Sequence, residues 1–315
     1  MISVRRPFTL AAAVLAVATT VGACGTSGTT GGSSGGSSSP GGTVPVVTSF
    51  YPVQYAVQQV GGSQVSVTSL TKAGAEPHDV ELSPQDVAGL TRASLVVYAR
   101  GFQPAVDTAV DQEAPDRALD VAPVANLDLA APAEQGAAAA NGAKDPHFWL
   151  DPQRYSAVVS AIADRLAATD PDHAADYRAN AAALTARLTQ LDADFRSGTT
   201  TCRVKDLVTG HAAFGYLASR YGFTQVPIAG LSPDVEPSAA KLAEVADFVK
   251  AHRITTIYAE TLVEPAFADT VARNTGAKVA TLDPIEGLTS ASAGTDYLEV
   301  MRSNLAVLKA GQGCS

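Results

Sequence analysis

Three histidines and one aspartate stand in positions that suit metal binding. They are His78 in "GAEPHD", His147 in "DPHFW", His211 in "GHAAFGY" and Asp283 in "LDP", and they are separated by 69, 64 and 72 residues. Three neutral imidazoles and one carboxylate suit four-coordinate Zn²⁺, whereas nitrogen ligands disfavour Ca²⁺ and Mg²⁺. No local motif such as HExxH joins them, so the alternative is three loop histidines in separate hydrogen bonds.

The segments before these residues predict that most of them converge. His78 follows the strand-like run "QVSVTSL", His211 follows "DLVTG" and Asp283 follows "KVATL". In open α/β sheets, ligands bind in the crevice outside the carboxyl ends of strands. His147 instead follows the residues 127–144, which are poor in large apolar side chains, and must approach from the domain edge.

Other candidates near the proposed site carry less weight. Glu260 ends the strand-like run "ITTIYAE" and is a candidate to orient a ligand imidazole, because metal-bound histidines need a partner on the other ring nitrogen. The alternative for Glu260 is an exposed helix cap. His173 and His252 occupy ordinary solvated helix positions, and Trp149 is expected to pack in the core beside His147.

Strand-like and helix-like segments alternate along the chain after residue 44. Helical spacing follows a β-branched run several times, in "VPVVTSF" and "YPVQYAVQQVGG" for example. This alternation predicts an α/β fold with parallel or mixed sheets flanked by helices. We expect an N-terminal lobe over 45–169, a long linker helix over 170–197 and a C-terminal lobe over 198–315. The linker helix should bury one apolar stripe, made of Tyr177, Leu184, Leu188, Leu191 and Phe195.

The N-terminal residues have the pattern of an export signal. Two arginines precede an Ala-rich apolar run that is short for a membrane span, and "VGAC" resembles a bacterial lipoprotein box. We therefore expect a signal peptide over 1–23, a lipidated Cys24, and a flexible Gly/Ser tether that completes 24–44. The alternative is an ordinary signal peptide with an incidental cysteine. The lipid would hold the protein at the outer face of the cytoplasmic membrane.

Charge and cysteine content limit the remaining possibilities. The net charge of -9 becomes -11 once Arg5 and Arg6 are removed, which disfavours nucleic acid as a partner. If Cys24 carries lipid, Cys202 and Cys314 remain, and an even pair outside the cytoplasm usually forms a disulfide. The alternative is two free thiols.

The chain resembles the zinc/manganese-specific solute-binding lipoproteins of metal ABC importers over nearly all of residues 45–315. The segments that carry the resemblance include "VVTSFYPVQYAVQQVGG", "DPHFWLDP", "TGHAAFGYLASRYG", "GLSPDVEPSAAKLAEVADFVK" and "LDPIEGL". The resemblance implies two α/β lobes joined by a rigid helix, a metal in the cleft between them, and a membrane permease as partner. By position, the family's ligands fall on His78, His147, His211 and Asp283.

The resemblance also bears on the identity of the metal. Manganese members have a glutamate where this chain has His211, so the histidine favours Zn(II) as the transported ligand. No histidine occurs in "LAAPAEQGAAAANGAK", which departs from the His-rich loop of many zinc members. Some members use a glutamate next to the first histidine as fourth ligand, but Pro77 separates Glu76 from His78 and favours Asp283.

We therefore expect a monomeric zinc-capture protein that delivers its metal to an ABC permease and is not an enzyme. A manganese or iron carrier of the same family is the first alternative. A zinc-dependent hydrolase is disfavoured, since a fourth protein ligand would fill the open position that catalytic zinc needs. A surface adhesin role would be compatible with transport.

Overall fold

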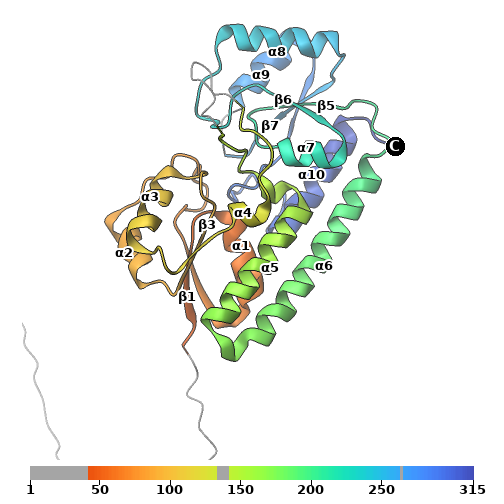
Figure 1. The fold of residues 1–315 in the computed structure, drawn as a ribbon. Helices are drawn as coiled ribbons and strands as arrows, with labels where there is room; N and C mark the ends of the chain where they lie inside the picture. Colours follow the sequence, from red (N-terminus) through yellow and green to blue (C-terminus); the bar gives the residue numbers. More distant parts are fainter. Residues whose placement is uncertain (1–41, 133–141, 263–264) are drawn as a thin grey trace, which may run out of the picture. The chain divides into compact units, whose positions relative to one another are not determined.

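The computed structural model describes residues 42–132, 142–262 and 265–315 (Figure 1). The predicted signal peptide, the lipidation site Cys24 and nearly all of the predicted tether lie outside these residues. Residues 42–315 form one compact unit. None of the helices in the described ranges combines the length and the hydrophobicity that crossing a bilayer requires.

The N-terminal lobe is built on a parallel four-stranded sheet of order β2-β1-β3-β4. Its strands are β1 (Val44–Thr48), β2 (Val65–Ser69), β3 (Leu95–Tyr98) and β4 (Ala118–Asp120). Its helices are α1 (Tyr51–Gly61), α2 (Pro84–Arg92), α3 (Pro104–Glu113) and the short α4 (Ala122–Ala125). α1 packs against β1 and β2, and α2 packs against β1, which covers these strands as a parallel sheet requires.

The C-terminal lobe repeats this arrangement with the order β6-β5-β7-β8, again all parallel. Its strands are β5 (Asp206–Thr209), β6 (Thr224–Pro227), β7 (Thr256–Ala259) and β8 (Lys278–Thr281). Its helices are α7 (Gly215–Tyr221), α8 (Ala239–Ala251), α9 (Ala266–Thr275) and α10 (Tyr297–Gly311). The predicted α/β fold with two lobes is therefore confirmed, and both sheets are parallel rather than mixed.

Two long helices connect the lobes. α5 (Pro152–Thr169) begins at Asp151, whose side chain accepts a hydrogen bond from the main-chain N–H of Gln153. After the short 3-10 turn Pro171–His173, α6 (Ala174–Thr199) runs back along α5 and also packs against α1 and α10 (Figure 1). All members of its predicted apolar stripe are buried: Tyr177, Leu184, Leu188, Leu191 and Phe195. The linker helix thus contacts helices from both halves of the chain.

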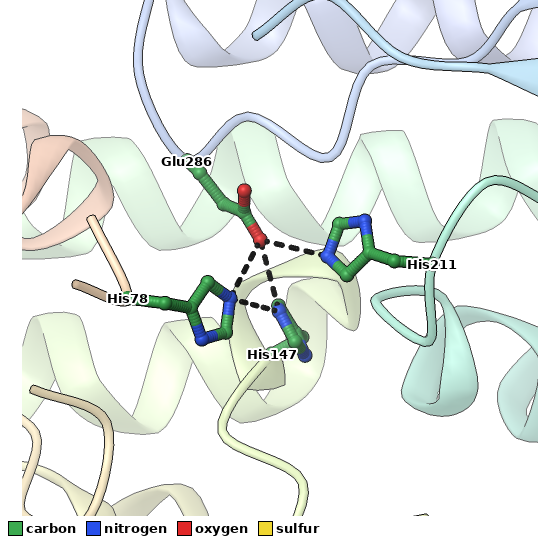
Figure 2. Close-up of side chains that lie close together, drawn as sticks. All are labelled: His78, His147, His211 and Glu286. Carbon is green, nitrogen blue, oxygen red and sulfur yellow. Dashed lines mark hydrogen bonds and ion pairs between the residues drawn. The ribbon is translucent and has the colours of Figure 1, made fainter. Parts of the chain in front are cut away.

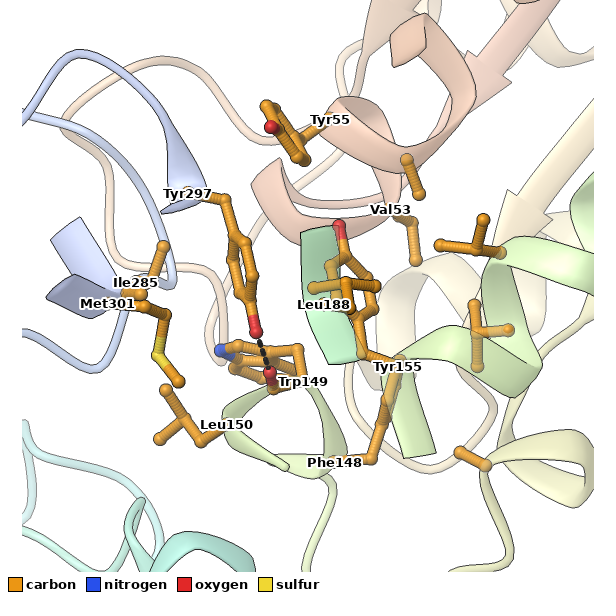
Figure 3. Packing of buried hydrophobic residues seen from close by; sticks show 14 of the residues in the cluster. Val53, Tyr55, Phe148, Trp149, Leu150, Tyr155, Leu188, Ile285, Tyr297 and Met301 are labelled. Atoms are coloured by element: carbon orange, nitrogen blue, oxygen red, sulfur yellow. Dashed lines mark hydrogen bonds between the residues drawn. The ribbon is translucent and has the colours of Figure 1, made fainter. Parts of the chain in front are cut away.

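The largest hydrophobic core extends across both lobes rather than lying within one. It includes Val53 and Tyr55 of α1, Trp149, and Tyr297 and Met301 of α10 (Figure 3). The rings of Tyr55 and Tyr155 both lie close to the Tyr297 ring, with centroids 5.8 and 4.6 Å away. Aromatic side chains bury large apolar areas, so this core fixes the two lobes against each other.

The sequence patterns do not predict some of the short elements. β4 has three residues and β6 ends in a proline, so neither shows the length or alternation of a typical strand. α3 was also not predicted, although Pro104 at its first position and the helical spacing of its buried Val106, Ala109 and Val110 are typical of a helix. α7 begins at Gly215, four residues after His211, and is followed by Gly222 in the left-handed conformation that favours glycine.

The predicted disulfide between Cys202 and Cys314 is present. It joins the segment after α6 to the end of the chain and closes a loop with a sequence separation of 112 residues. The same junction is held by Gln312, whose side chain donates to the main-chain carbonyls of Val204 and Asp206. The disulfide therefore fastens the end of the chain after α10 to the segment between α6 and β5.

We expect removal of this disulfide to lower the free energy of unfolding by about 2–4 kcal/mol, because the crosslink restricts the unfolded chain. The measurement is urea denaturation of residues 42–315 carrying Cys202→Ala and Cys314→Ala together. The unmodified protein, measured with and without reductant, is the control. Equal unfolding midpoints for the double variant and the oxidised protein would contradict this expectation.

Candidate metal centre

Four buried side chains converge on one point between the lobes (Figure 2). His78, His147, His211 and Glu286 each offer one ligand atom, and these atoms all lie within 4.8 Å of one another. His147 and His211 are completely buried, and His78 and Glu286 are 7% and 1% exposed. The four side chains are therefore almost completely removed from water.

Each ligand candidate lies in a loop that the sheets position. His78 follows β2, His211 follows β5 and Glu286 follows β8, so three of them lie beyond the carboxyl ends of parallel strands. His147 directly precedes the 3-10 turn Phe148–Leu150 that leads into α5. The N-terminal lobe thus supplies two imidazoles, and the C-terminal lobe supplies an imidazole and a carboxylate.

The spacing of these atoms suits a tetrahedral zinc ion. Oε1 of Glu286 lies 3.4, 2.9 and 3.2 Å from Nε2 of His78, His147 and His211, in that order. The Nε2 atoms of His78 and His147 are 3.3 Å apart. Tetrahedral ligands about 2.0–2.1 Å from zinc lie roughly 3.3 Å from one another. The residues present therefore fit the donor type, number and spacing of a zinc site.

Two carboxylates set the direction in which the imidazoles point. Asp145 Oδ1 accepts hydrogen bonds from the main-chain N–H of His147, at 2.9 Å, and from its Nδ1, at 2.7 Å. Glu260 contacts His211 in the same way, with 2.7 Å to its main-chain nitrogen and 2.5 Å to Nδ1. With Nδ1 donating, each Nε2 presents its lone pair to the centre, which is the arrangement that metal-bound histidines need.

The structure brings Glu260 to the place that the sequence suggested, whereas sequence reasoning missed Asp145. A signal for it exists in "DPH", since an aspartate commonly accepts a hydrogen bond from the main-chain N–H two residues later.

His78 is held differently. Its main-chain N–H donates to Glu76 Oε1 at 3.0 Å, and its ring meets the Phe102 ring edge-on, with centroids 4.7 Å apart. Glu76 is a neighbour of the cluster and not a member of it.

The expectation for Asp283 needs correction, because Glu286 takes its place in the cluster. The Asp283 carboxylate is already engaged by the main-chain N–H of Ile285 and the hydroxyl of Ser292, both at 2.8 Å. This turn directs the chain so that Glu286, three residues later in "LDPIEGL", reaches the histidines. The glutamate was visible in that segment, but sequence spacing does not reveal which acid a turn points inward.

Electrostatics favour positive charge at the centre. Burial raises the pKa of Glu286, yet the three imidazoles around it lower the pKa well below its usual value. Burial lowers the pKa of His211, but Glu260 and Glu286 raise it well above its usual value, and Asp145 and Glu286 similarly raise that of His147. Burial dominates at His78 and lowers its pKa.

The other two histidines are at the surface, as the sequence indicates. His173 and His252 contact Asp170 and Asp206 at 2.7 and 2.8 Å, far in sequence from the cluster. Trp149 is fully buried, and its ring centroid lies 5.2 Å from that of His147. Its indole N–H donates to the carbonyl of Pro284 at 2.7 Å, so the turn after His147 is bonded to the loop that carries Glu286.

Comparison with known proteins places this chain in a family. Residues 46–311 match the family described as zinc-uptake complex component A, periplasmic. The chain belongs to this family. The match confirms the resemblance to the solute-binding lipoproteins of metal ABC importers that the sequence indicated. It covers both lobes.

Individual relatives of the zinc-uptake family span the described residues. The high-affinity zinc uptake system protein ZnuA of Bacillus subtilis is 36% identical over 312 residues, covering 96% of this chain and 95% of the relative. The zinc-binding protein AdcA of Streptococcus pyogenes is 37% identical over 290 residues, but the match spans 85% of this chain and only 56% of AdcA. The crystal structure of the Zn(II)-bound ZnuA-like domain of Streptococcus pneumoniae AdcA has a TM-score of 0.72 at 38% identity, covering 86% of this chain and 99% of that domain.

We expect Glu286→Gln to weaken zinc binding more than Asp283→Asn does, because only Glu286 reaches the histidines. Loss of a group that merely orients a ligand costs roughly 10–100-fold in metal affinity, and Glu286→Gln should exceed this range. Competition titration with a zinc chelator measures both variants against the unchanged protein. A larger loss of zinc affinity for Asp283→Asn would indicate that Asp283, and not Glu286, is the fourth ligand.

Proposed function

We propose that this protein captures Zn(II) at His78, His147, His211 and Glu286 and delivers it to an ABC-type permease for import. The observation that carries the proposal is the buried cluster of three Nε2 atoms and one carboxylate oxygen at tetrahedral spacing. Membership of the zinc-uptake family supports transport as the purpose of that binding.

The donor set favours zinc over manganese and iron. His211 contributes a nitrogen, and three imidazoles with a single carboxylate form a softer set than the oxygen-rich sites that suit Mn²⁺. Four protein ligands also fill a tetrahedral zinc ion, whereas catalytic zinc keeps a position open for water or substrate. The zinc hydrolase alternative is accordingly disfavoured by the cluster and by the transport family.

The rest of the chain fits a tethered carrier. We propose that residues 1–23 are a signal peptide, that lipid on Cys24 anchors the protein to the outer face of the cytoplasmic membrane, and that a Gly/Ser tether extends to residue 44. The lobes 45–169 and 198–315, with the linker helix 170–197, then act as a monomer. Membrane fractionation of a Cys24→Ala variant tests the anchor.

Metal analysis of the purified protein tests the capture function. We expect one Zn²⁺ per chain by native mass spectrometry, and preference for Zn²⁺ over Mn²⁺ in direct competition. His211→Ala should lose most of this affinity, because it removes one of four ligands and leaves a cavity beside Glu260. His252→Ala is the matched control, since that imidazole lies at the surface. An absence of stoichiometric zinc, or unchanged binding by His211→Ala, would refute the proposal.

Zinc affinity should fall as pH falls. The pKa values of His147 and His211 are raised in the metal-free protein, so both imidazoles hold protons at a pH where an ordinary histidine, with a pKa near ~6.5, has lost them. Zinc must displace these protons, which costs about tenfold in affinity per pH unit for each proton released. Chelator competition from about pH 8 to 5.5, corrected for protonation of the chelator, measures the slope. A flat profile would show that the imidazoles are already neutral.

A further inference from the structure

Two glycines flank His211 in "GHAAFG", and each lies against a carboxylate that orients a ligand histidine. A Cβ atom added to Gly210 would lie 2.5 Å from Glu260 Oε1, and one added to Gly215 would lie 2.5 Å from Asp145 Oδ2. Carbon and oxygen atoms that are not bonded do not approach this closely. Both carboxylates occupy space that any other residue type at these positions would fill.

The backbone does not explain why glycine stands at either position. Neither Gly210 nor Gly215 has a positive φ angle, so both adopt conformations that alanine also adopts. Gly215 is in addition the first residue of α7, where alanine is a better helix former. What glycine provides at these two positions is clearance for a neighbouring side chain.

We propose that Gly210 and Gly215 are positioning residues that set metal affinity by leaving room for Glu260 and Asp145. This inference rests on the proposed zinc function. It names two further residues on which the zinc affinity depends. At both glycines the nearest atom is the end of a side chain that can rotate away. An added methyl group is therefore accommodated by displacing the carboxylate, and the loss falls on the imidazole that the carboxylate holds.

The two substitutions should disturb different histidines. Glu260 orients His211, which directly follows Gly210, so that effect remains local. Asp145 belongs to the other lobe and orients His147, although Gly215 lies four residues after His211. A methyl group at Gly215 should thus disturb the distant histidine and spare the nearby one. Through this contact α7 of the C-terminal lobe controls a ligand of the N-terminal lobe.

The test compares Gly210→Ala and Gly215→Ala with the unchanged protein, using Gly89→Ala as control. Gly89 lies in α2, and a Cβ there would meet nothing within 4 Å. We expect each of the first two variants to lose about 10–100-fold in zinc affinity, as removal of an orienting partner does, and Gly89→Ala to lose none. Equal affinity for all four proteins would overturn the proposal.

Proton–nitrogen NMR of the imidazoles supplies a second readout in the metal-free protein. The Nδ1–H protons that Asp145 and Glu260 hold should give separate signals for His147 and His211. We expect Gly215→Ala to shift or broaden the His147 signal alone, and Gly210→Ala the His211 signal alone. If Gly215→Ala perturbs His211 and not His147, the effect is a local disturbance of α7 and the proposal fails.

A double-mutant cycle isolates the steric cause. In an Asp145→Ala background the carboxylate is already absent, so adding Gly215→Ala should lower affinity no further. Additive losses would overturn the proposal. If Gly215→Ala does not fold alone, the double variant still decides, because it should fold and bind as Asp145→Ala does, and failure to do so would also contradict the proposal.

These outcomes separate this inference from the proposed function. If the unchanged protein bound no zinc, the proposed function would fail, while the metal-free NMR signals would still show whether the glycines control the two imidazoles. If zinc bound normally in every glycine variant, the positioning role would fail and zinc capture would stand.

Discussion

A carboxylate oxygen and three imidazole nitrogens can share one buried point only if protons or a metal ion lie between them. In this protein three imidazole nitrogens and a carboxylate oxygen meet at separations of 2.9–3.4 Å, away from the water that would otherwise solvate them. Burial of such groups without compensation costs several kcal/mol, and protons or a metal ion provide the compensation. The same charge requirement explains why the pKa values of His147 and His211 rise while that of Glu286 falls.

This requirement determines how the surrounding structure is built. Each parallel sheet brings its loops to the carboxyl edge, and the two edges face one another across the cleft, so residues far apart in sequence become neighbours. Asp145 and Glu260 then fix the ring orientation of two ligands. The shared aromatic core around Trp149 and Tyr297 sets the distance between the lobes (Figure 3), because Trp149 bonds the Glu286 loop and Tyr297 bonds the Trp149 carbonyl.

The sequence predicted the parts of this arrangement that leave a periodic or compositional trace. The β-branched runs before His78 and His211 identified the strands, the stripe from Tyr177 to Phe195 identified the linker helix, and the three histidines are the ones that the structure brings together in the buried cluster. Asp283 lies outside that cluster and Glu286 inside it, because the direction of each side chain depends on a turn that Ser292 and Asn304 stabilise from elsewhere in the chain. The clearance at Gly215 depends on a contact between lobes, which no local pattern encodes.

The division of the ligands between the lobes also explains how one site can both hold and release a metal. His78 and His147 come from one lobe, and His211 and Glu286 come from the other, so neither lobe alone completes a tetrahedral set. Zinc bonds extend only about 2.0–2.1 Å, and a relative displacement of the lobes by a comparable distance breaks half of them. For the proposed function, separation of the two ligand pairs is therefore sufficient for release, and no ligand has to unfold. Because the Asp145 carboxylate lies next to Gly215 of α7 in the opposite lobe, the orientation of His147 also depends on how the two lobes pack.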